Sequence, residues 1–101
     1  MSDPFLRATV SVFNRLGHAA TYTPVSGAPV TCRAIVNRDV AMVGEYGQVT
    51  EKRTQIELMK QDVATPKRGD TIVIAEGVYA GTYTVESKDS DDGYVVRVIV
   101  R

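Results

Sequence analysis

The side chains best suited to chemistry are few in this chain, and they do not gather in the sequence. His18 is the only histidine and Cys32 is the only cysteine. A Ser–His–Asp triad or a zinc site would have to be built around this single imidazole, without a GxSxG sequence or a second Cys or His nearby. His18 follows a predicted helix end, where its partial positive charge suits the helix dipole. Cys32 alternates with Val30 and Ala34, which favours a buried apolar role.

Acidic residues cluster in the sequence DSDDG at positions 89–93. An EF-hand loop that began at the first of these residues would need glycine at its sixth position and glutamate at its twelfth. Those positions hold Tyr94 and Val100, so the segment is better interpreted as a solvated hairpin turn. The neighbouring carboxylates Asp91 and Asp92 lie in that turn, where nothing would raise a pKa for acid–base catalysis. We therefore expect no catalytic residue, no metal site and no enzymatic activity.

Phosphate-binding loops are equally absent from the sequence. A P-loop requires G-x-x-x-x-G-K-[ST], and no Gly-Lys pair occurs in the chain. A Rossmann phosphate-binding turn needs closely spaced glycines after a strand and at the start of a helix. Gly44 and Gly47 do not have this spacing or these neighbours. The basic pairs at 52–53 and 67–68 are more typical of soluble strand edges. Twelve basic residues balance twelve acidic ones, so no net charge draws the protein to nucleic acid or to an anionic membrane. No cofactor is expected.

The size and composition predict one domain in a reducing compartment. The chain has 101 residues, enough for a single domain. It shows no basic start followed by a long apolar run, and no stretch of the roughly 18 apolar residues that a membrane helix needs. A lone cysteine cannot form an internal disulfide. We expect a soluble protein in the cytoplasm of the cell that makes it.

The first part of the chain predicts one short helix at about residues 3–16. Pro4 suits a first helical turn, because its missing N–H would be unpaired there anyway. Gly17 is a natural stop. The apolar residues recur at helical spacing and predict one inner face. These residues are Leu6, Val10, Phe13 and Leu16.

From residue 18 onward the apolar period changes to two, which is typical of strands. Six short segments carry this period or a β-rich composition, namely residues 19–25, 30–36, 54–60, 71–75, 81–87 and 94–100. Turn signals separate them, including the Arg-Gly-Asp sequence at 68–70. The pattern predicts a mainly β fold, a small antiparallel β-barrel or sandwich with one N-terminal helix. The predicted core residues are Ile72, Val85, Val96 and Val98.

The sequence NRDVAMVGEYGQVTEKR, at residues 37–53, has apolar residues that follow no clean period. Two glycines interrupt it, so we expect a long irregular loop at about residues 37–50. Loops of this length in compact domains are usually functional or disordered. Its apolar side chains would be stabilised if another subunit covered them, and Tyr and Met are favoured in interface cores. The alternative is that the loop folds back over its own sheet. The candidate assembly interface consists of Val40, Met42, Val43, Tyr46, Lys52 and Arg53.

Several sequence features, taken in order, resemble the head–tail joining proteins of lambda-like tailed phages and prophages, which are head-completion or neck-connector proteins. The features are a short helix ending in RLG, the strand VTCRAIV, the long segment after it, P-x-x-G-D at 66–70, GTYTV at 81–85 and DDGYVVRVIV at 91–100. The resemblance implies a small β-barrel or sandwich with a helix against it. It also implies a structural virion protein without catalytic residues, sequence-specific nucleic-acid contacts or a membrane.

The resemblance further implies partners. Copies would form a ring in the neck between head and tail, with six as a candidate number, and the free protein would be a monomer. The partners would be other neck and portal-side head proteins on one side and a tail-terminator protein on the other. Three other interpretations stay open: a tail-terminator or minor tail protein, a host-side module that binds a peptide at a sheet edge, and a small enzyme that uses His18.

Overall fold

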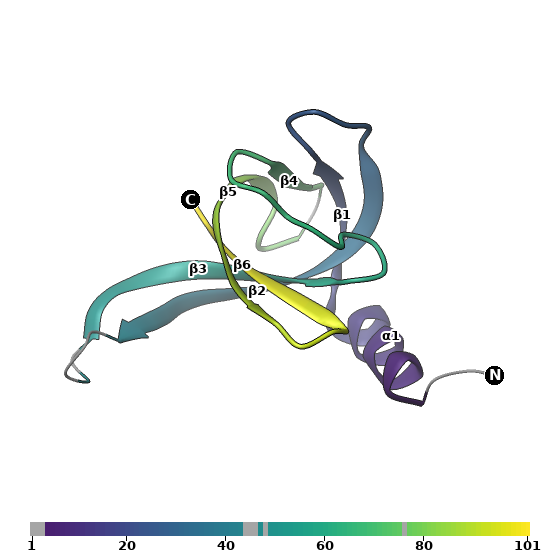
Figure 1. The fold of residues 1–101 in the computed structure, drawn as a ribbon, viewed down its shortest axis with the longest axis horizontal. Coiled ribbons are helices and arrows are strands. Elements are labelled where there is room, and N and C mark those ends of the chain that lie inside the picture. The colour runs from purple at the N-terminus through teal and green to yellow at the C-terminus, as the bar shows by residue number, and fades with distance from the viewer. Residues whose placement is uncertain (1–3, 44–46, 48, 76) are drawn as a thin grey trace.

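The computed structural model describes residues 4–43, 47, 49–75 and 77–101, and it leaves the side chains of 39–43 and 49–52 outside this description. The described part contains one helix followed by strands (Figure 1). The elements are α1 (Pro4–Leu16), β1 (His18–Thr23), β2 (Val30–Val43), β3 (Val49–Met59), β4 (Thr71–Ile74), β5 (Gly81–Asp91) and β6 (Val95–Val100). The predictions of a mainly β fold and of a helix at about residues 3–16 are confirmed.

The strands form one closed antiparallel barrel in the order β1-β2-β3-β6-β5-β4. Closure comes from β1, which pairs with β2 on one side and with β4 on the other. Ala20, for example, lies opposite Cys32 in β2 and opposite Ile74 in β4. The sequence left barrel and sandwich open, and this double pairing of β1 makes the fold a barrel, because closure leaves no free sheet edge around the ring of strands.

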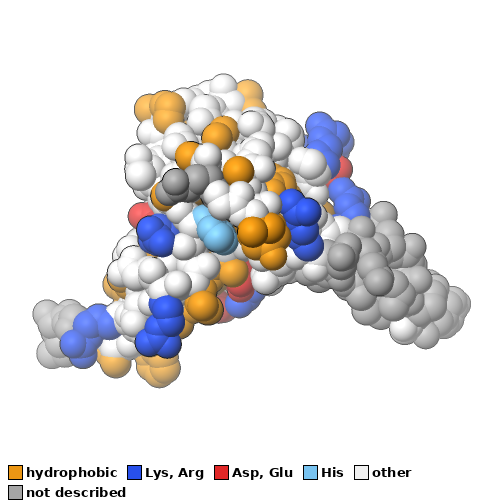
Figure 2. Space-filling model, turned by 180° about the vertical axis from the view of Figure 1, so that it is seen from behind, with side chains coloured by type: hydrophobic (Ala, Val, Ile, Leu, Met, Phe, Trp, Pro, Cys, Tyr) orange, Lys and Arg blue, Asp and Glu red, His pale blue; other side chains and the backbone are white. Residues whose placement is uncertain are grey.

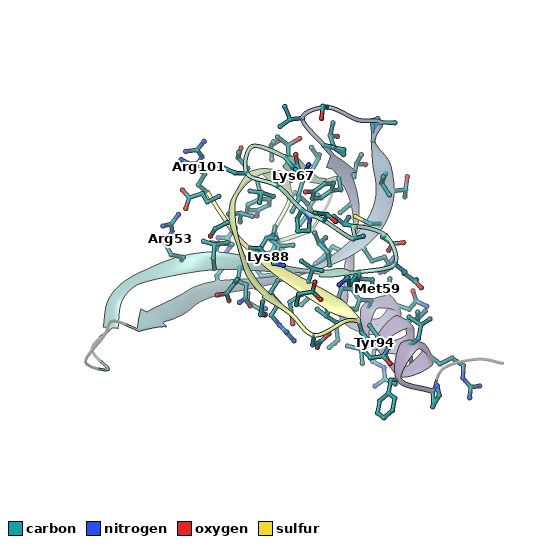
Figure 3. The ribbon with its side chains drawn as sticks, in the orientation of Figure 1. Arg53, Met59, Lys67, Lys88, Tyr94 and Arg101 are labelled. Carbon is teal, nitrogen blue, oxygen red and sulfur yellow. The ribbon has the colours of Figure 1, made fainter. Side chains whose placement is uncertain are left out.

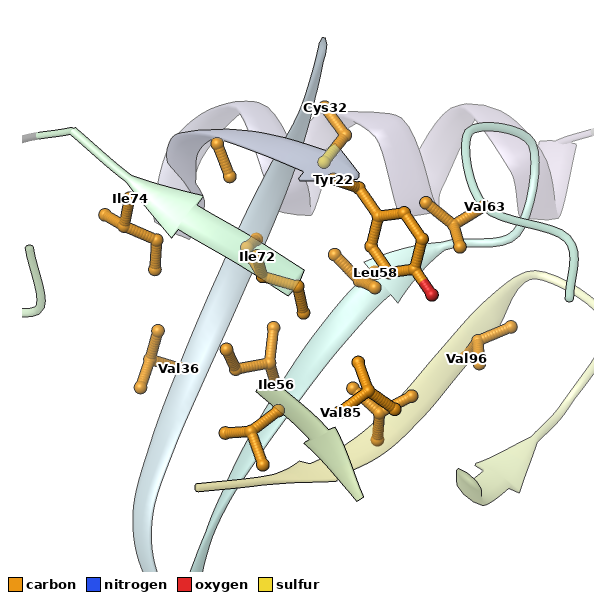
Figure 4. Packing of buried hydrophobic residues seen from close by; sticks show 14 residues of the cluster. Tyr22, Cys32, Val36, Ile56, Leu58, Val63, Ile72, Ile74, Val85 and Val96 are labelled. Carbon is orange, nitrogen blue, oxygen red and sulfur yellow. The ribbon is translucent and has the colours of Figure 1, made fainter. Parts of the chain in front are cut away.

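The barrel interior is filled by apolar side chains at the inward-facing positions, which alternate with outward-facing ones along the strands (Figure 4). The four predicted core residues Ile72, Val85, Val96 and Val98 are at most 1% exposed, so the predicted register of these strands is confirmed. Cys32 is also buried in this cluster. Burial of such side chains is the main favourable term for a domain of this size.

Helix α1 rests on the barrel through Phe13, which is 2% exposed. The helix ends where the Gly17 amide donates a hydrogen bond of 2.8 Å to the Phe13 carbonyl. A Cβ at position 17 would lie 2.5 Å from that oxygen, so only glycine fits this approach. The Arg33 guanidinium of β2 caps the same end, donating to the carbonyls of Phe13 at 3.0 Å and Gly17 at 2.6 Å. The positive charge suits the helix C-terminus.

The predicted inner face of α1 is wrong at Leu16, which is 60% exposed. Leu16 follows Phe13 by three residues, which turns it back by about 60° around the helix axis, away from Leu6 and Val10. Because the barrel meets the helix along the line of Phe13, Leu16 falls outside the contact. Leu6 and Val10 are partly buried.

The prediction of an irregular loop at 37–50 is wrong for residues 37–43 and 49–50, which belong to β2 and β3. Residues 44–46 and 48 lie outside the described part. The β2–β3 pairing shifts register between Asn37 and Val40 and again between Met42 and Val43. A bulge inserts a residue into one strand and breaks its alternation. The apolar residues of this strand therefore show no clean period in the sequence, although the backbone is extended.

Candidate assembly surface

Strands β2 and β3 run past the barrel as a two-stranded ribbon (Figure 1). β2 pairs with β1 only up to Ala34, and β3 pairs with β6 only from Thr54 onward. Beyond these points the described backbones of β2 and β3 pair only with each other, with Val40 opposite Arg53. We call the paired strands 38–43 and 49–53 the arm. The arm and α1 lie toward opposite ends of the long axis of the molecule, which measures 45 × 28 × 27 Å.

Along the described backbone of the arm, neither strand has a second neighbour. An isolated two-stranded ribbon is only marginally stable in water. Its outer N–H and C=O groups can also hydrogen-bond to another chain. The arm is therefore the part of the fold whose backbone is best suited to pairing with, or lying against, a neighbouring protein.

The structure brings five of the six predicted interface positions into the arm. Val40, Met42 and Val43 lie on β2, and Lys52 and Arg53 lie on β3. Tyr46 falls outside the described residues, as do the side chains of the other positions except Arg53. The Arg53 side chain is half-buried and forms an ion pair with Glu86 of β5. Within the chain, Arg53 therefore joins the base of the arm to the barrel.

The β2 strand meets a second set of contacts at the base of the arm. The Arg38 guanidinium lies 5.0 Å from the ring centroid of Tyr79. The Tyr83 hydroxyl donates a hydrogen bond of 2.7 Å to the Tyr79 carbonyl. The His18 ring meets Tyr79 edge-on at 5.6 Å between centroids. His18 is thus the first residue of β1, packed on an aromatic ring, rather than the last residue of the helix.

Asp70 is a buried polar residue that the sequence analysis missed. It is 3% exposed and accepts hydrogen bonds from the Tyr22 hydroxyl and from the amides of Val25 and Lys67, the last two at 2.9 Å. Burial alone would raise the pKa of Asp70, but these hydrogen bonds outweigh it and hold the pKa below its usual value. Burial and the Asp70 carboxylate raise the pKa of Tyr22. The P-x-x-G-D sequence at 66–70 was the available signal, interpreted only as a turn.

The Asp70 hydrogen bonds join the loop at 24–29 to the loop at 62–70, and these two loops line an open cleft of about 490 Å³. Asp62 lies in its lining, and burial raises the pKa of that carboxyl. Burial and the charge of Asp62 raise the pKa of the Cys32 thiol to about 11. A thiol with such a pKa stays protonated at neutral pH and is a poor nucleophile.

A second groove, of about 380 Å³, lies between α1 and the barrel. Phe5 and Val12 line it from the helix and are 69% and 47% exposed. Tyr94 lines it from the barrel side, with its ring centroid 6.2 Å from that of Phe5. Figure 2 shows the molecule from behind the view of Figure 1. On this face the histidine lies beside apolar side chains, with several Lys and Arg side chains around them.

Among the described residues, no three His, Cys, Asp or Glu side chains come together as metal ligands. The described part also contains no helix that is long and apolar enough to cross a membrane. A closed antiparallel barrel that carries a helix and a projecting strand pair defines a small β-barrel protein. The sequence matches the model of the family described as Phage Head-Tail Attachment protein over residues 1–100. The chain belongs to this family, and the resemblance to head–tail joining proteins is confirmed. No curated protein matches the chain.

Proposed function

We propose that this protein is a structural component of the phage neck that joins the DNA-filled head to the tail. Membership of the head–tail attachment family supports a virion protein that contacts other head or tail proteins. The observation that carries the finer proposal is the arm, a strand pair that leaves the barrel and, along its described backbone, has no further neighbour. The protein acts by stoichiometric assembly rather than by turnover.

In this proposal the arm is the main contact between subunits. Its sequence carries Val40, Met42, Val43 and Tyr46, side chains that a neighbouring subunit could remove from water. Lys52 adds a cation to the same strand pair, next to Arg53 at the base of the arm. The free protein is a monomer in the host cytoplasm, and copies form a ring in the virion neck, with six as a candidate number. A ring needs the same contact repeated around a closed symmetry.

The neighbours of this ring are a portal-side head protein and the tail-terminator protein. The nearest alternative is that the chain is itself a tail terminator or minor tail protein. The two proposals differ in order of assembly, because a neck protein binds filled heads before tails arrive, whereas a tail terminator binds tails first. A host-side peptide-binding module would bind neither.

The test mixes the purified protein with DNA-filled heads that lack tails, or with free tails, and separates particles from free protein by sedimentation. We expect the protein on heads, followed by infectious particles when tails are added. Replacing residues 40–46 by a Gly/Ser linker should leave the barrel folded, because residues 40–43 pair only with β3 in the arm and take no part in the strand pairs that close the barrel. The same variant should fail to restore infectivity. Binding to tails alone would favour the tail-terminator function, and full activity of the linker variant would refute the role of the arm.

A further inference from the structure

Among the described side chains, a cationic contact from each strand of the arm reaches the barrel. On β2, Arg38 lies 5.0 Å from the centroid of the Tyr79 ring, and its Nη2 atom is 3.5 Å from the Tyr83 hydroxyl. On β3, Arg53 forms its ion pair with Glu86 of β5. Figure 3 places Arg53 where the ribbon leaves the barrel. We call these two contacts the braces of the arm.

Both braces coincide with irregularities of strand pairing. The β2–β3 register shifts between residues 37 and 40, so Arg38 lies inside this shift. The β5–β6 register shifts between residues 85 and 87, and Glu86 is the residue in between. A bulge bends its strand and turns a side chain out of the regular alternation. The two irregularities thus set the directions from which Arg38 and Glu86 meet their partners.

The aromatic side of the first brace is itself fixed to the barrel. Tyr79 lies in the connection between β4 and β5, and its carbonyl accepts a hydrogen bond of 2.7 Å from the Tyr83 hydroxyl. The His18 ring packs against its edge at 5.6 Å. The hydrogen bond holds the Tyr79 backbone and the His18 ring holds the edge of its side chain. A cation above such a ring is attracted by its π electrons.

The second brace is only partly exposed to solvent. The side chains of Arg53 and Glu86 each keep 26% of their surface exposed. A single pair of this kind contributes little to the stability of a whole domain. Its effect on the angle of a thin ribbon is larger, because the described arm has no other strand to resist bending. Contacts on both strands restrain the ribbon better than either one does.

We propose that Arg38, Tyr79, Arg53 and Glu86 are positioning residues that hold the arm at a preset angle to the barrel. The idea that this angle presents the arm to a neighbouring neck protein rests on the proposed function. The idea that the four residues fix the angle is independent of that function. An arm that is oriented before binding loses less conformational freedom when it docks.

The first experiment measures the angle in the intact, free protein. Spin labels on Ala41→Cys, in strand β2 of the arm, and on Thr65→Cys, on an exposed barrel loop, report their separation by pulsed electron resonance. Cys32 is buried and should stay unlabelled. We expect a narrow distance distribution in this background and a clearly wider one when Arg38→Gln and Glu86→Gln are added. An unchanged width after both changes would overturn the proposal.

Matched variants separate orientation from general damage. Arg7→Gln removes an exposed cation of α1 and should leave the distribution narrow. The double variant should keep the thermal midpoint of the barrel. Arg53→Glu should widen the distribution, and adding Glu86→Arg should narrow it again, because the exchanged pair restores the attraction. A failure of this rescue would show that the ion pair does not orient the arm.

The second experiment titrates tailless heads with the double variant and counts the joined particles at each concentration, which gives an apparent affinity for heads. We expect a loss on the order of tenfold in apparent affinity for heads, which corresponds to about 1.4 kcal/mol of lost preorganisation. A wider distribution with unchanged joining would confirm the braces and refute the use of the preset angle in the neck. A narrow distribution with lost joining would refute the braces and leave the proposed function intact.

Discussion

The first prediction concerns Asp70, whose hydrogen bonds join two loops and strand β1 at one end of the barrel. Asp70→Ala removes a buried carboxylate that accepts hydrogen bonds from Tyr22, Val25 and Lys67. It leaves a buried hydroxyl and the amides of two loops without their acceptor. Hydrogen bonds to a charged group contribute about 1.5–3 kcal/mol each, and they are not additive within one network. We therefore expect a loss of roughly 3–5 kcal/mol in the free energy of unfolding.

Asp70→Asn keeps the shape and is the matched variant. One carboxylate oxygen of Asp70 faces the Val25 amide, and the other faces Tyr22 and the Lys67 amide. An asparagine amide group must point its NH₂ at one of these donors, whichever way it is turned. We expect a loss of about 1–3 kcal/mol for Asn. A domain of this size unfolds with about 5–15 kcal/mol, so both losses are measurable by urea denaturation followed by circular dichroism.

The stability difference between the parent and Asp70→Asn should depend on pH. The pKa of Asp70 is lower in the folded protein than its usual value, so the folded state favours the ionised form. This contribution is complete above the unfolded pKa of about 3.9 and is lost as the pH falls through the folded value. The difference in stability between the parent and Asp70→Asn should therefore shrink on acidification below about pH 4. A loss under about 0.5 kcal/mol for Asp70→Ala, as for ordinary surface changes, would refute the reasoning.

The other predictions concern the core, the thiol and the arm. Val98→Ala should destabilise by about 1–3 kcal/mol in urea, whereas Val73→Ala, at a site 39% exposed, should cost less; equal effects would mean that the register is wrong. Cys32 should resist a thiol reagent at pH 8 until the protein unfolds, because it is buried with a pKa of about 11. Rapid labelling of the folded protein would contradict this. In hydrogen exchange, amides of the arm should exchange faster than those of Ile72, Ile74, Val96 and Val98, because a two-stranded ribbon opens more easily than a closed barrel. Equal protection in the monomer would show that the arm is as stable as the core. Met42→Ala and Tyr46→Ala should reduce joining of heads and tails more than Glu45→Ala, since an exposed charge contributes little at an interface rim. Equal losses in a count of infectious particles would argue against apolar anchoring.

The apolar pattern by itself determined the secondary-structure elements and their inward faces wherever a face had to be buried. A period of two in the segments around Ile72, Val85 and Val98 is enough to predict strands and their inward residues, because one face of each strand must leave water. The helix was equally predictable, since Pro4 and Gly17 mark its ends and Phe13 its inner side. These are local properties, and neighbouring residues in the chain are sufficient to express them.

Only the tertiary structure decided the features that join residues far apart in the chain. Bulges changed the alternation of β2 after Asn37, so a strand looked like a loop in the sequence. Asp70 looked like a turn residue because its partner Tyr22 is 48 positions away. The ion pair of Arg53 was not predictable because its partner Glu86, 33 positions away, belongs to another strand. A side chain's partner across the barrel depends on closure and register, and neither is written in the residues beside it.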